Sequence, residues 1–133
     1  MASVPTGPIV YDAGALIAAE AGDRSVTAMH SQAIDRERLV IVPSPVLTQV
    51  WRGGGARQAL LSFVLRGCAI NATDERVAKL AGTLLGRSGT SDAVDAIVVA
   101  TAAVVSAEIV TSDPDDLRVL IDVADRQIPL IEV

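Results

Sequence analysis

Residues 107–117 read AEIVTSDPDDL, in which a short β-branched run leads into an aspartate, a proline and two further aspartates. The run 108–110 predicts a buried strand, and Pro114 is typical of the first residue of a helix. Asp113 therefore stands where a strand ends and a helix begins. In open α/β sheets, binding sites form in the crevice beyond the carboxyl ends of the strands. This stretch thus predicts both a fold class and a candidate site for a metal ion.

The same arrangement recurs around Asp12 and around Asp95. Residues 8–11 form a short apolar run that ends at Asp12, and a helix is expected over residues 13–21. Asp95 precedes the apolar run 96–105, which is rich in β-branched residues and fits a buried strand when it is taken alone. The whole element, residues 92–106, is longer than the ~5–6 residues of a typical strand, so a buried helix is favoured.

Short apolar runs alternate with helical segments along the rest of the chain. Further strands are expected at 39–42, 67–70 and 129–132, and further helices at 23–38, 44–52, 56–65 and 74–87. This alternation implies a mostly parallel sheet of about five short strands with helices on both faces. With 133 residues, the chain is expected to form one domain, residues 1–133, of the α/β class.

The composition limits the classes of protein to which the chain can belong. Hydrophobic residues make up 50% of it and aromatic residues only 2%, so the expected core consists of Ala, Val, Leu and Ile. The single cysteine, Cys68, excludes an internal disulfide and fits a reducing compartment. The formal charge of -5 argues against a general nucleic-acid binder, since affinity for phosphate comes from clustered Lys and Arg.

The sequence predicts neither a leader peptide nor a membrane segment. No basic and apolar leader opens it, and the most apolar run, residues 96–105, has about half of the roughly 20 residues that a membrane span needs. We therefore expect a soluble cytoplasmic protein. His30, the sole histidine, falls among helical residues that are expected to be exposed, and its surroundings match no zinc-binding spacing.

Carboxylates from the three places described above are expected to meet at one edge of the sheet. Asp92 and Asp95 are three residues apart and share one helix face, and Asp116 follows Asp113 by one helical turn. Such a cluster is unfavourable without cations, because like charges at close range raise one another's pKa. Mg²⁺ and Mn²⁺ take oxygen ligands and need no His or Cys. This chemistry suits hydrolysis of a phosphodiester by metal-activated water.

Helix capping is the competing interpretation. Asp is a favoured N-cap residue, and negative charge near a helix N-terminus stabilises the helix by about 0.3–1 kcal/mol. Asp113 before Pro114 and Asp92 before its helix both fit this role, so spacing alone leaves their function open. Asp95 is harder to explain as a purely structural residue, because an unpaired carboxylate beside an apolar run is costly.

Three segments together carry a resemblance to a known family. Residues 10–17 (VYDAGALI), 91–102 (SDAVDAIVVATA) and 109–117 (IVTSDPDDL) resemble, in this order, the first, third and fourth motifs of PIN domains. Their order and spacing extend over essentially the whole chain, whose length is similar to that of the VapC-like ribonucleases of bacterial toxin–antitoxin pairs. The resemblance implies a three-layer α/β/α fold and endonucleolytic cleavage of RNA that depends on Mg²⁺ or Mn²⁺. It also implies a homodimer and a cognate antitoxin that covers the acidic groove.

The resemblance assigns roles to particular residues of this sequence. It implies that three aspartates are metal ligands and catalytic residues, namely Asp12, Asp95 and Asp113. Two others would be secondary or water-mediated ligands, Asp92 and Asp116. Thr111, two residues before Asp113, would orient a carboxylate or a water molecule.

One position departs from the family pattern. PIN domains usually place a Glu on the helix after the second strand, and the corresponding segment, residues 43–52, offers Gln49. An amide oxygen can coordinate a metal ion but adds no negative charge, so metal affinity should fall and a base at this position is lost. Asp92 is then a candidate for the missing carboxylate. The alternative is a catalytically weak or inactive PIN-like module that binds RNA or an antitoxin.

Two arginines farther along the chain, Arg52 and Arg57, are candidates for binding substrate phosphate, although the charges of a solvated helix surface explain them equally well. Residues 53–55, Gly-Gly-Gly, lack the lysine of a phosphate-binding P-loop and predict a turn or a hinge. A phospho-acceptor receiver domain, another small α/β fold with acidic strand ends, is disfavoured. Asp12 has no adjacent acid, and the sole lysine, Lys79, lies within a predicted helix rather than after a late strand.

Overall fold

A computed structural model describes residues 5–133 of the chain. Its centre is one sheet of five strands in the order β3-β2-β1-β4-β5, and each neighbouring pair is parallel. The strands are β1 (Ile9–Tyr11), β2 (Val40–Pro43), β3 (Ala69–Asn71), β4 (Glu108–Thr111) and β5 (Leu130–Glu132). Their positions agree closely with the segments that the sequence predicts, so the expected α/β class with a parallel sheet is confirmed.

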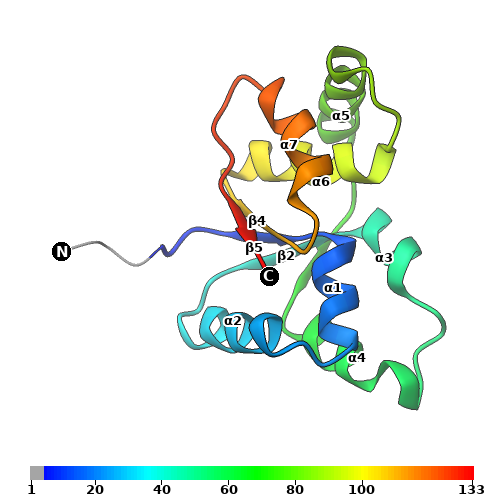
Figure 1. Cartoon of the computed structure of the whole chain (residues 1–133), viewed down its shortest axis with the longest axis vertical. Coiled ribbons are helices and arrows are strands. Elements are labelled where there is room, and N and C mark those ends of the chain that lie inside the picture. The colour runs from blue at the N-terminus through cyan, green and yellow to red at the C-terminus, as the bar shows by residue number, and fades with distance from the viewer. Residues whose placement is uncertain (1–4) are drawn as a thin grey trace.

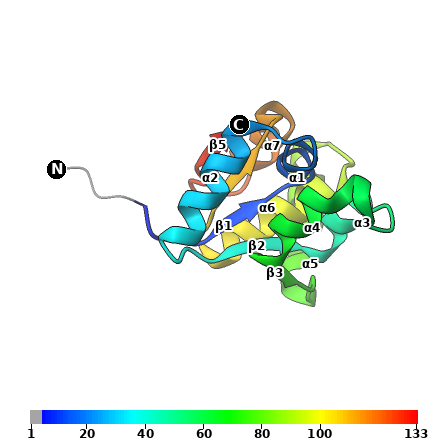
Figure 2. The same cartoon turned by 90° about the horizontal axis from the view of Figure 1, so that it is seen from below.

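Helices cover both faces of this sheet. They are α1 (Ala13–Glu20), α2 (Arg24–Asp35), α3 (Ser44–Val50), α4 (Ala59–Arg66), α5 (Glu75–Ser88), α6 (Ala93–Val105) and α7 (Pro114–Asp122), with a short 3-10 helix, η1 (Ala56–Gln58), before α4. Figure 1 shows α5, α6 and α7 above the sheet and α1, α2 and α4 below it. Figure 2 looks onto the lower layer from below. The three-layer arrangement is therefore confirmed.

The core is aliphatic, and its deepest helix is α6. The central strands β1 and β2 are buried along their whole length, as is most of β4. The apolar segment 96–105 lies in α6, which has 13 residues, most of them buried. The length of the segment therefore predicted its structure correctly, although its β-branched residues alone favour a strand.

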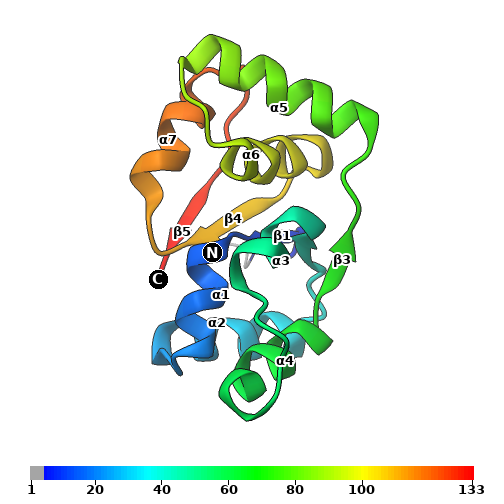
Figure 3. The same cartoon turned by 90° about the vertical axis from the view of Figure 1, so that its right-hand side faces the viewer.

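All five strands run in the same direction, so their carboxyl ends lie together at what we call the carboxyl edge. There β1 leads into α1, β2 into α3 and β4 into α7. Because α6 ends just before β4 begins and packs along the sheet, its N-terminus lies at the same edge. Figure 3 shows α3 between α1 and α6, and α3 contacts both helices. The carboxyl edge thus collects the starts of four helices.

No single helix within residues 5–133 is long and apolar enough to cross a membrane. Only α5 and α6 taken together satisfy the criteria of length and hydropathy, as a pair bent by 117°. In the fold, α6 packs against β1, β2 and β4.

His30 does not lie on the exposed face that we expected. Val26, His30 and Ala33 have the spacing of one helical stripe, and this stripe is the buried side of α2. His30 is 5% exposed, and its Nδ1 atom lies 2.8 Å from the hydroxyl oxygen of Tyr11, at the end of β1. Burial lowers the pKa of His30 and raises that of the Tyr11 phenol. One hydrogen bond between two neutral side chains therefore joins α2 to the centre of the sheet.

Tyr11→Phe removes this hydrogen bond and should lower the free energy of unfolding by about 1–2 kcal/mol, because the buried Nδ1 atom of His30 loses its partner. Urea denaturation near neutral pH measures the effect. Thr27→Val is the matched control, since it removes an exposed hydroxyl from the same helix, and it should change stability by less than about 0.5 kcal/mol. A Tyr11→Phe variant as stable as the wild type contradicts the stabilising role of the pair.

Candidate functional site

Asp12 connects β1 to α1 and is held by several hydrogen bonds. It is 6% exposed, and its Oδ1 atom accepts the backbone N–H of Ala15 at 2.8 Å, so that it caps α1. The Thr111 hydroxyl and the Gly14 N–H also donate to this carboxylate. Burial raises the pKa of Asp12 despite these donors, and the charge of Asp113 raises it further. Asp12 is therefore a buried carboxylate whose negative charge is costly without a counter-charge.

Thr111 links Asp12 to Asp113 across two neighbouring strand ends. It is fully buried at the end of β4, and its hydroxyl oxygen accepts the backbone N–H of Asp113 at 3.0 Å. The same hydroxyl donates to the carboxylate of Asp12. This geometry fixes both the Asp12 side chain and the backbone that carries Asp113. Asp113 occupies the N-cap position of α7, but its side chain makes no capping hydrogen bond.

Asp92, in contrast, does cap its helix. Its side chain accepts the backbone N–H of Asp95 at 2.9 Å in the first turn of α6. The capping interpretation, which the sequence left open for two aspartates, therefore applies to the side chain of Asp92 and not to that of Asp113. Asp92 remains exposed, so capping does not bury its charge.

Asp95 interacts electrostatically with four other aspartates. Its pKa is raised to about 6, first by burial and then by the negative charges of Asp92, Asp12, Asp116 and Asp113, in that order. Each of these charges must lie near Asp95 to contribute, because the interaction of charges falls with distance and is screened by solvent. Carboxylates from three separate segments of the chain therefore converge at the carboxyl edge.

A hollow of about 300 Å³ opens beside Asp95. It is lined by Thr90, Ser91, Asp92, Asp95, Asp116, Val119 and Leu120. Three of the five carboxylates thus border one hollow, whereas Asp12 and Asp113 lie outside its lining. Thr90 and Ser91 are polar lining residues that we did not expect. The sequence could have indicated them, because these two hydroxyl residues directly precede Asp92, the N-cap of α6.

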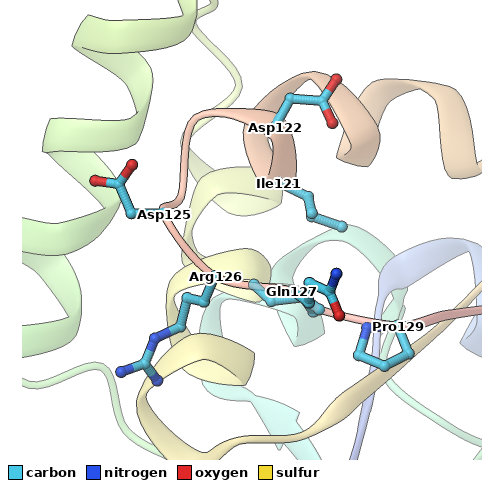
Figure 4. Close-up of a pocket in the computed structure, with 7 residues that line it drawn as sticks. Ile121, Asp122, Asp125, Arg126, Gln127 and Pro129 are labelled. Atoms are coloured by element: carbon cyan, nitrogen blue, oxygen red, sulfur yellow. The ribbon is translucent and has the colours of Figure 1, made fainter.

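A larger hollow, of about 540 Å³, lies away from these carboxylates, between α7 and β5. Figure 4 shows its lining, which consists of Ile121, Asp122, Asp125, Arg126, Gln127, Ile128 and Pro129. The guanidinium of Arg126 donates to the carbonyl oxygen of Ala103 near the end of α6, and Arg87 pairs with Asp125 at 3.0 Å. These charged groups hold helices in place. We therefore place the candidate site by its chemistry, at the carboxyl edge, rather than by the size of a hollow.

The donors at the carboxyl edge suit a hard divalent cation, because all five side chains offer carboxylate oxygens. In the described part of the chain, however, no three His, Cys, Asp or Glu side chains come close enough to coordinate one ion. Like charges repel, and the capping hydrogen bonds of Asp12 and Asp92 hold these side chains toward their own helices. The carboxylates thus share one edge without forming a closed ligand shell.

Gln49 and the two arginines lie on the surface around α3. Gln49 is exposed near the end of α3 and does not line the acidic hollow. The guanidinium of Arg52 folds back and donates to the carbonyl oxygens of Thr48, Gln49 and Trp51, which closes the end of α3. Arg57 is exposed in η1. Arg52 therefore has a structural role in this conformation, whereas Arg57 projects from a surface turn.

The three glycines form a turn that is held by hydrogen bonds to one buried side chain. Residues 53–55 have φ angles of 91°, 76° and 78°, which favour glycine. The side chain of Gln58, which is 3% exposed, makes four hydrogen bonds, to Glu20, Val50, Arg52 and Gly54. Its role was not apparent from the sequence, because the four partners meet only in the folded chain. This one amide ties the turn to the ends of α1 and α3.

The chain is similar to several proteins of known structure, and no curated protein sequence matches it significantly. VapBC2 from Rickettsia felis, bound to a promoter DNA fragment, has a TM-score of 0.75 at 14% identity, over 94% of this chain and 98% of that chain. DNA-bound VapBC from Salmonella typhimurium has a TM-score of 0.69 at 14% identity, over 94% and 97%. A toxin–antitoxin complex from Klebsiella pneumoniae has a TM-score of 0.65 at 20% identity, over 81% and 88%.

At such identities, structural similarity shows the fold, and family membership needs a match of the sequence itself. The sequence matches the PIN domain family over residues 9–122. This span runs from the start of β1 to the end of α7 and contains all five aspartates of the carboxyl edge. Since the match covers most of the chain and the whole candidate site, the chain belongs to the PIN domain family.

Proposed function

We propose that the chain is a cytoplasmic, divalent-metal-dependent endoribonuclease that hydrolyses RNA phosphodiester bonds and acts as the toxin of a toxin–antitoxin pair. One observation carries the proposal, the position of Asp92, Asp95 and Asp116 around one hollow at the carboxyl edge. The charges of Asp12 and Asp113 also act on Asp95 there. Members of the PIN domain family are generally nucleases that use divalent metals, which supports the same class of reaction. Similarity to toxin–antitoxin structures supports the biological role.

In the proposed site, Asp12, Asp95 and Asp113 hold Mg²⁺ or Mn²⁺, and Asp92 and Asp116 act through water. A cation bound there would lower the pKa of an attacking water and would stabilise the leaving oxygen of the phosphodiester. The negative charge needed to bind a cation comes entirely from aspartates, in agreement with the oxygen ligands that both metals prefer.

The chain's own groups prepare these carboxylates for binding. The Ala15 N–H and the Thr111 hydroxyl orient Asp12, and Thr111 also fixes the backbone at Asp113. Asp95, with a pKa of about 6, carries a proton in part of the molecules near neutral pH. It releases this proton when it binds a cation, so metal affinity should increase with pH.

The second candidate function is a catalytically weak PIN-like module that binds RNA or an antitoxin without cutting RNA. Gln49 is the observation that favours it, because an exposed neutral amide stands where the family usually has a carboxylate. In the proposed nuclease, Asp92 supplies the additional negative charge. The two functions therefore differ in whether the five aspartates alone bind metal well enough to cleave RNA, without a glutamate on α3.

A cognate antitoxin is the proposed protein partner. Four large apolar side chains are exposed on the layer formed by α1, α2 and α4, namely Ile17, Ile34, Leu60 and Phe63. Phe63 is the most exposed of them, at 66%. Exposed apolar side chains of this size are typical of surfaces that bind other proteins. An arginine of the antitoxin would pair with the acidic carboxyl edge.

A second copy of the chain is proposed to cover the surface around Trp51. An apolar hollow of about 460 Å³ is lined by Leu47, Thr48, Trp51, Leu65 and Ile70. It borders β3, an edge strand of the sheet, on which Ile70 is exposed. An exposed apolar residue on an edge strand favours association, and a homodimer through this face buries it.

Asp95→Asn should lower kcat/KM for cleavage of single-stranded RNA by on the order of 100-fold or more in Mn²⁺, because it removes a ligand charge. Gln49→Glu should raise activity, since it adds a carboxylate. Asp115→Asn is the matched control, because Asp115 is an exposed acid of α7 that pairs with Arg118 at 3.5 Å, and it should cut RNA like the wild type. Cleavage that appears only with Gln49→Glu supports the binding module. Metal-independent cleavage that Asp95→Asn leaves unchanged contradicts the proposed site.

Asp95 should destabilise the metal-free protein at neutral pH. Its folded pKa of about 6 exceeds its ordinary value of 3.8, so the stability linked to its protonation is complete below pH 3.8 and is lost as pH rises through about 6. Asp95→Asn should therefore be more stable than the wild type at neutral pH in EDTA, by about 1 kcal/mol after solvent screening. Saturating Mn²⁺ should stabilise the wild type more than the variant. Thermal unfolding measures both effects, and equal Mn²⁺ shifts in the two proteins argue against Asp95 as a ligand.

Phe63→Ser should weaken the complex with an antitoxin co-expressed from the neighbouring reading frame by about tenfold or more, because it removes an apolar contact residue. RNA cleavage by the isolated chain should not change. Leu39→Ser is the control, since Leu39 is a similarly exposed apolar residue before β2. Titration by calorimetry gives the two affinities. If both variants bind like the wild type, the antitoxin uses another surface.

A further inference from the structure

Gly14 is an unexpected residue for the first turn of α1. Glycine is less favourable than alanine inside a helix, because it loses more backbone freedom on folding. The glycines with positive φ in the described chain are Gly22, Gly53, Gly54, Gly55 and Gly89, so the backbone at Gly14 does not require glycine. The reason for the glycine must lie in what surrounds it.

The neighbour that a side chain at position 14 would displace is Ser112. A Cβ atom on Gly14 would lie 2.4 Å from the Ser112 Oγ atom and 3.4 Å from the Ser112 backbone nitrogen. Real Cβ atoms do not approach other atoms as closely as the first of these distances. The same Cβ would lie 3.4 Å from Oδ1 of Asp12. The hydroxyl of Ser112 therefore occupies the space above Gly14, beside the Asp12 carboxylate.

Ser112 is not needed to orient Asp12. The donors to that carboxylate are Ala15, Gly14 and Thr111. Ser112 is exposed and follows the buried Thr111, at the point where the chain leaves β4 for α7. Its hydroxyl is thus a neutral donor on an exposed residue beside these carboxylates, whereas the nearby Thr111 hydroxyl is already engaged.

We infer that the Ser112 hydroxyl donates a hydrogen bond to a non-bridging oxygen of the RNA phosphate at the carboxyl edge, and that Gly14 provides the space for it. The inference rests on the proposed function, which brings RNA to this edge. A phosphate that approaches several carboxylates is repelled, and a hydroxyl offers it a hydrogen bond without adding positive charge that would compete with a cation. Hydroxyl side chains are common phosphate contacts, and hydrogen bonds to a charged acceptor are stronger than neutral ones.

The test compares four variants with the wild type, namely Ser112→Ala, Gly14→Ala, Ser112→Gly and the double variant Gly14→Ala/Ser112→Gly. Ser112→Ala should raise KM for a single-stranded RNA about tenfold and leave kcat within about twofold. Gly14→Ala should raise KM similarly, because its methyl group displaces the hydroxyl, and it should also lower the melting temperature. Ser25→Ala, an exposed serine of α2, is the control and should have no effect.

The double variant separates a contact with RNA from a role in packing. Gly14→Ala/Ser112→Gly relieves the steric conflict, so its melting temperature should return toward that of the wild type, whereas its KM should stay about tenfold raised. The effects of the two single changes on KM should not add, since both remove one hydroxyl from one place. Recovery of KM together with stability overturns the inference, as does an unchanged KM in Ser112→Ala.

Binding of RNA distinguishes this inference from the proposed function. In the Asp95→Asn background, a fluorescent single-stranded RNA should bind about tenfold more weakly when Ser112→Ala is added. A chain that binds RNA but does not cut it contradicts the proposed hydrolysis, and the two dissociation constants still decide the role of Ser112. Equal dissociation constants overturn the role of Ser112 alone. A chain that neither binds nor cuts RNA overturns both.

Discussion

Mutual repulsion among the carboxylates at the carboxyl edge is the constraint on which the rest of the structure depends. A parallel sheet brings the ends of β1 and β4 together, and each of these strands is followed by an aspartate. The N-terminus of α6 adds Asp92 and Asp95 at the same edge. Backbone N–H groups at the starts of α1 and α6, together with the Thr111 hydroxyl, offset part of the repulsion. The part that remains adds to burial, the larger cause, in raising the pKa of Asp95.

The carboxyl edge has an acidic side, formed by the aspartates, and a side formed by α3, and the two differ in how their side chains are held. On one side, Asp95 belongs to a helix that is packed into the core, and Thr111 fixes Asp12 from beneath. On the other side, α3 presents an exposed Gln49, and Arg52 folds onto the end of the same helix. Gln58 holds the following turn from within. The acidic side is therefore organised before any ligand binds, whereas α3 itself carries no carboxylate.

Much of the fold could be predicted from the sequence because local signals agreed with tertiary structure. Apolar runs of strand length alternate with helical segments, and the length of the 92–106 element outweighed its β-branched residues. The convergence of the aspartates followed from the direction of the strands. Contacts between residues that are far apart in the chain could not be predicted from the sequence. The pairing of Tyr11 with His30 depends on how α2 rotates against the sheet, and the close approach of Ser112 to Gly14 depends on the packing of two strand ends. Which aspartate caps its helix depends on side-chain rotamers, which spacing does not determine.

The burial of α6 makes the carboxyl edge sensitive to changes that occur far from it. Val98 and Val99 are fully buried, in the turn that follows Asp95. Tightly packed interiors transmit displacement, so a smaller residue at either position lets the helix settle toward the sheet and carries the first turn with it. The affinity of the edge for a cation would then change with the packing of the core beneath it. In the proposed nuclease, inactivating substitutions should accordingly also be found among small apolar residues of the core, far from the acidic edge.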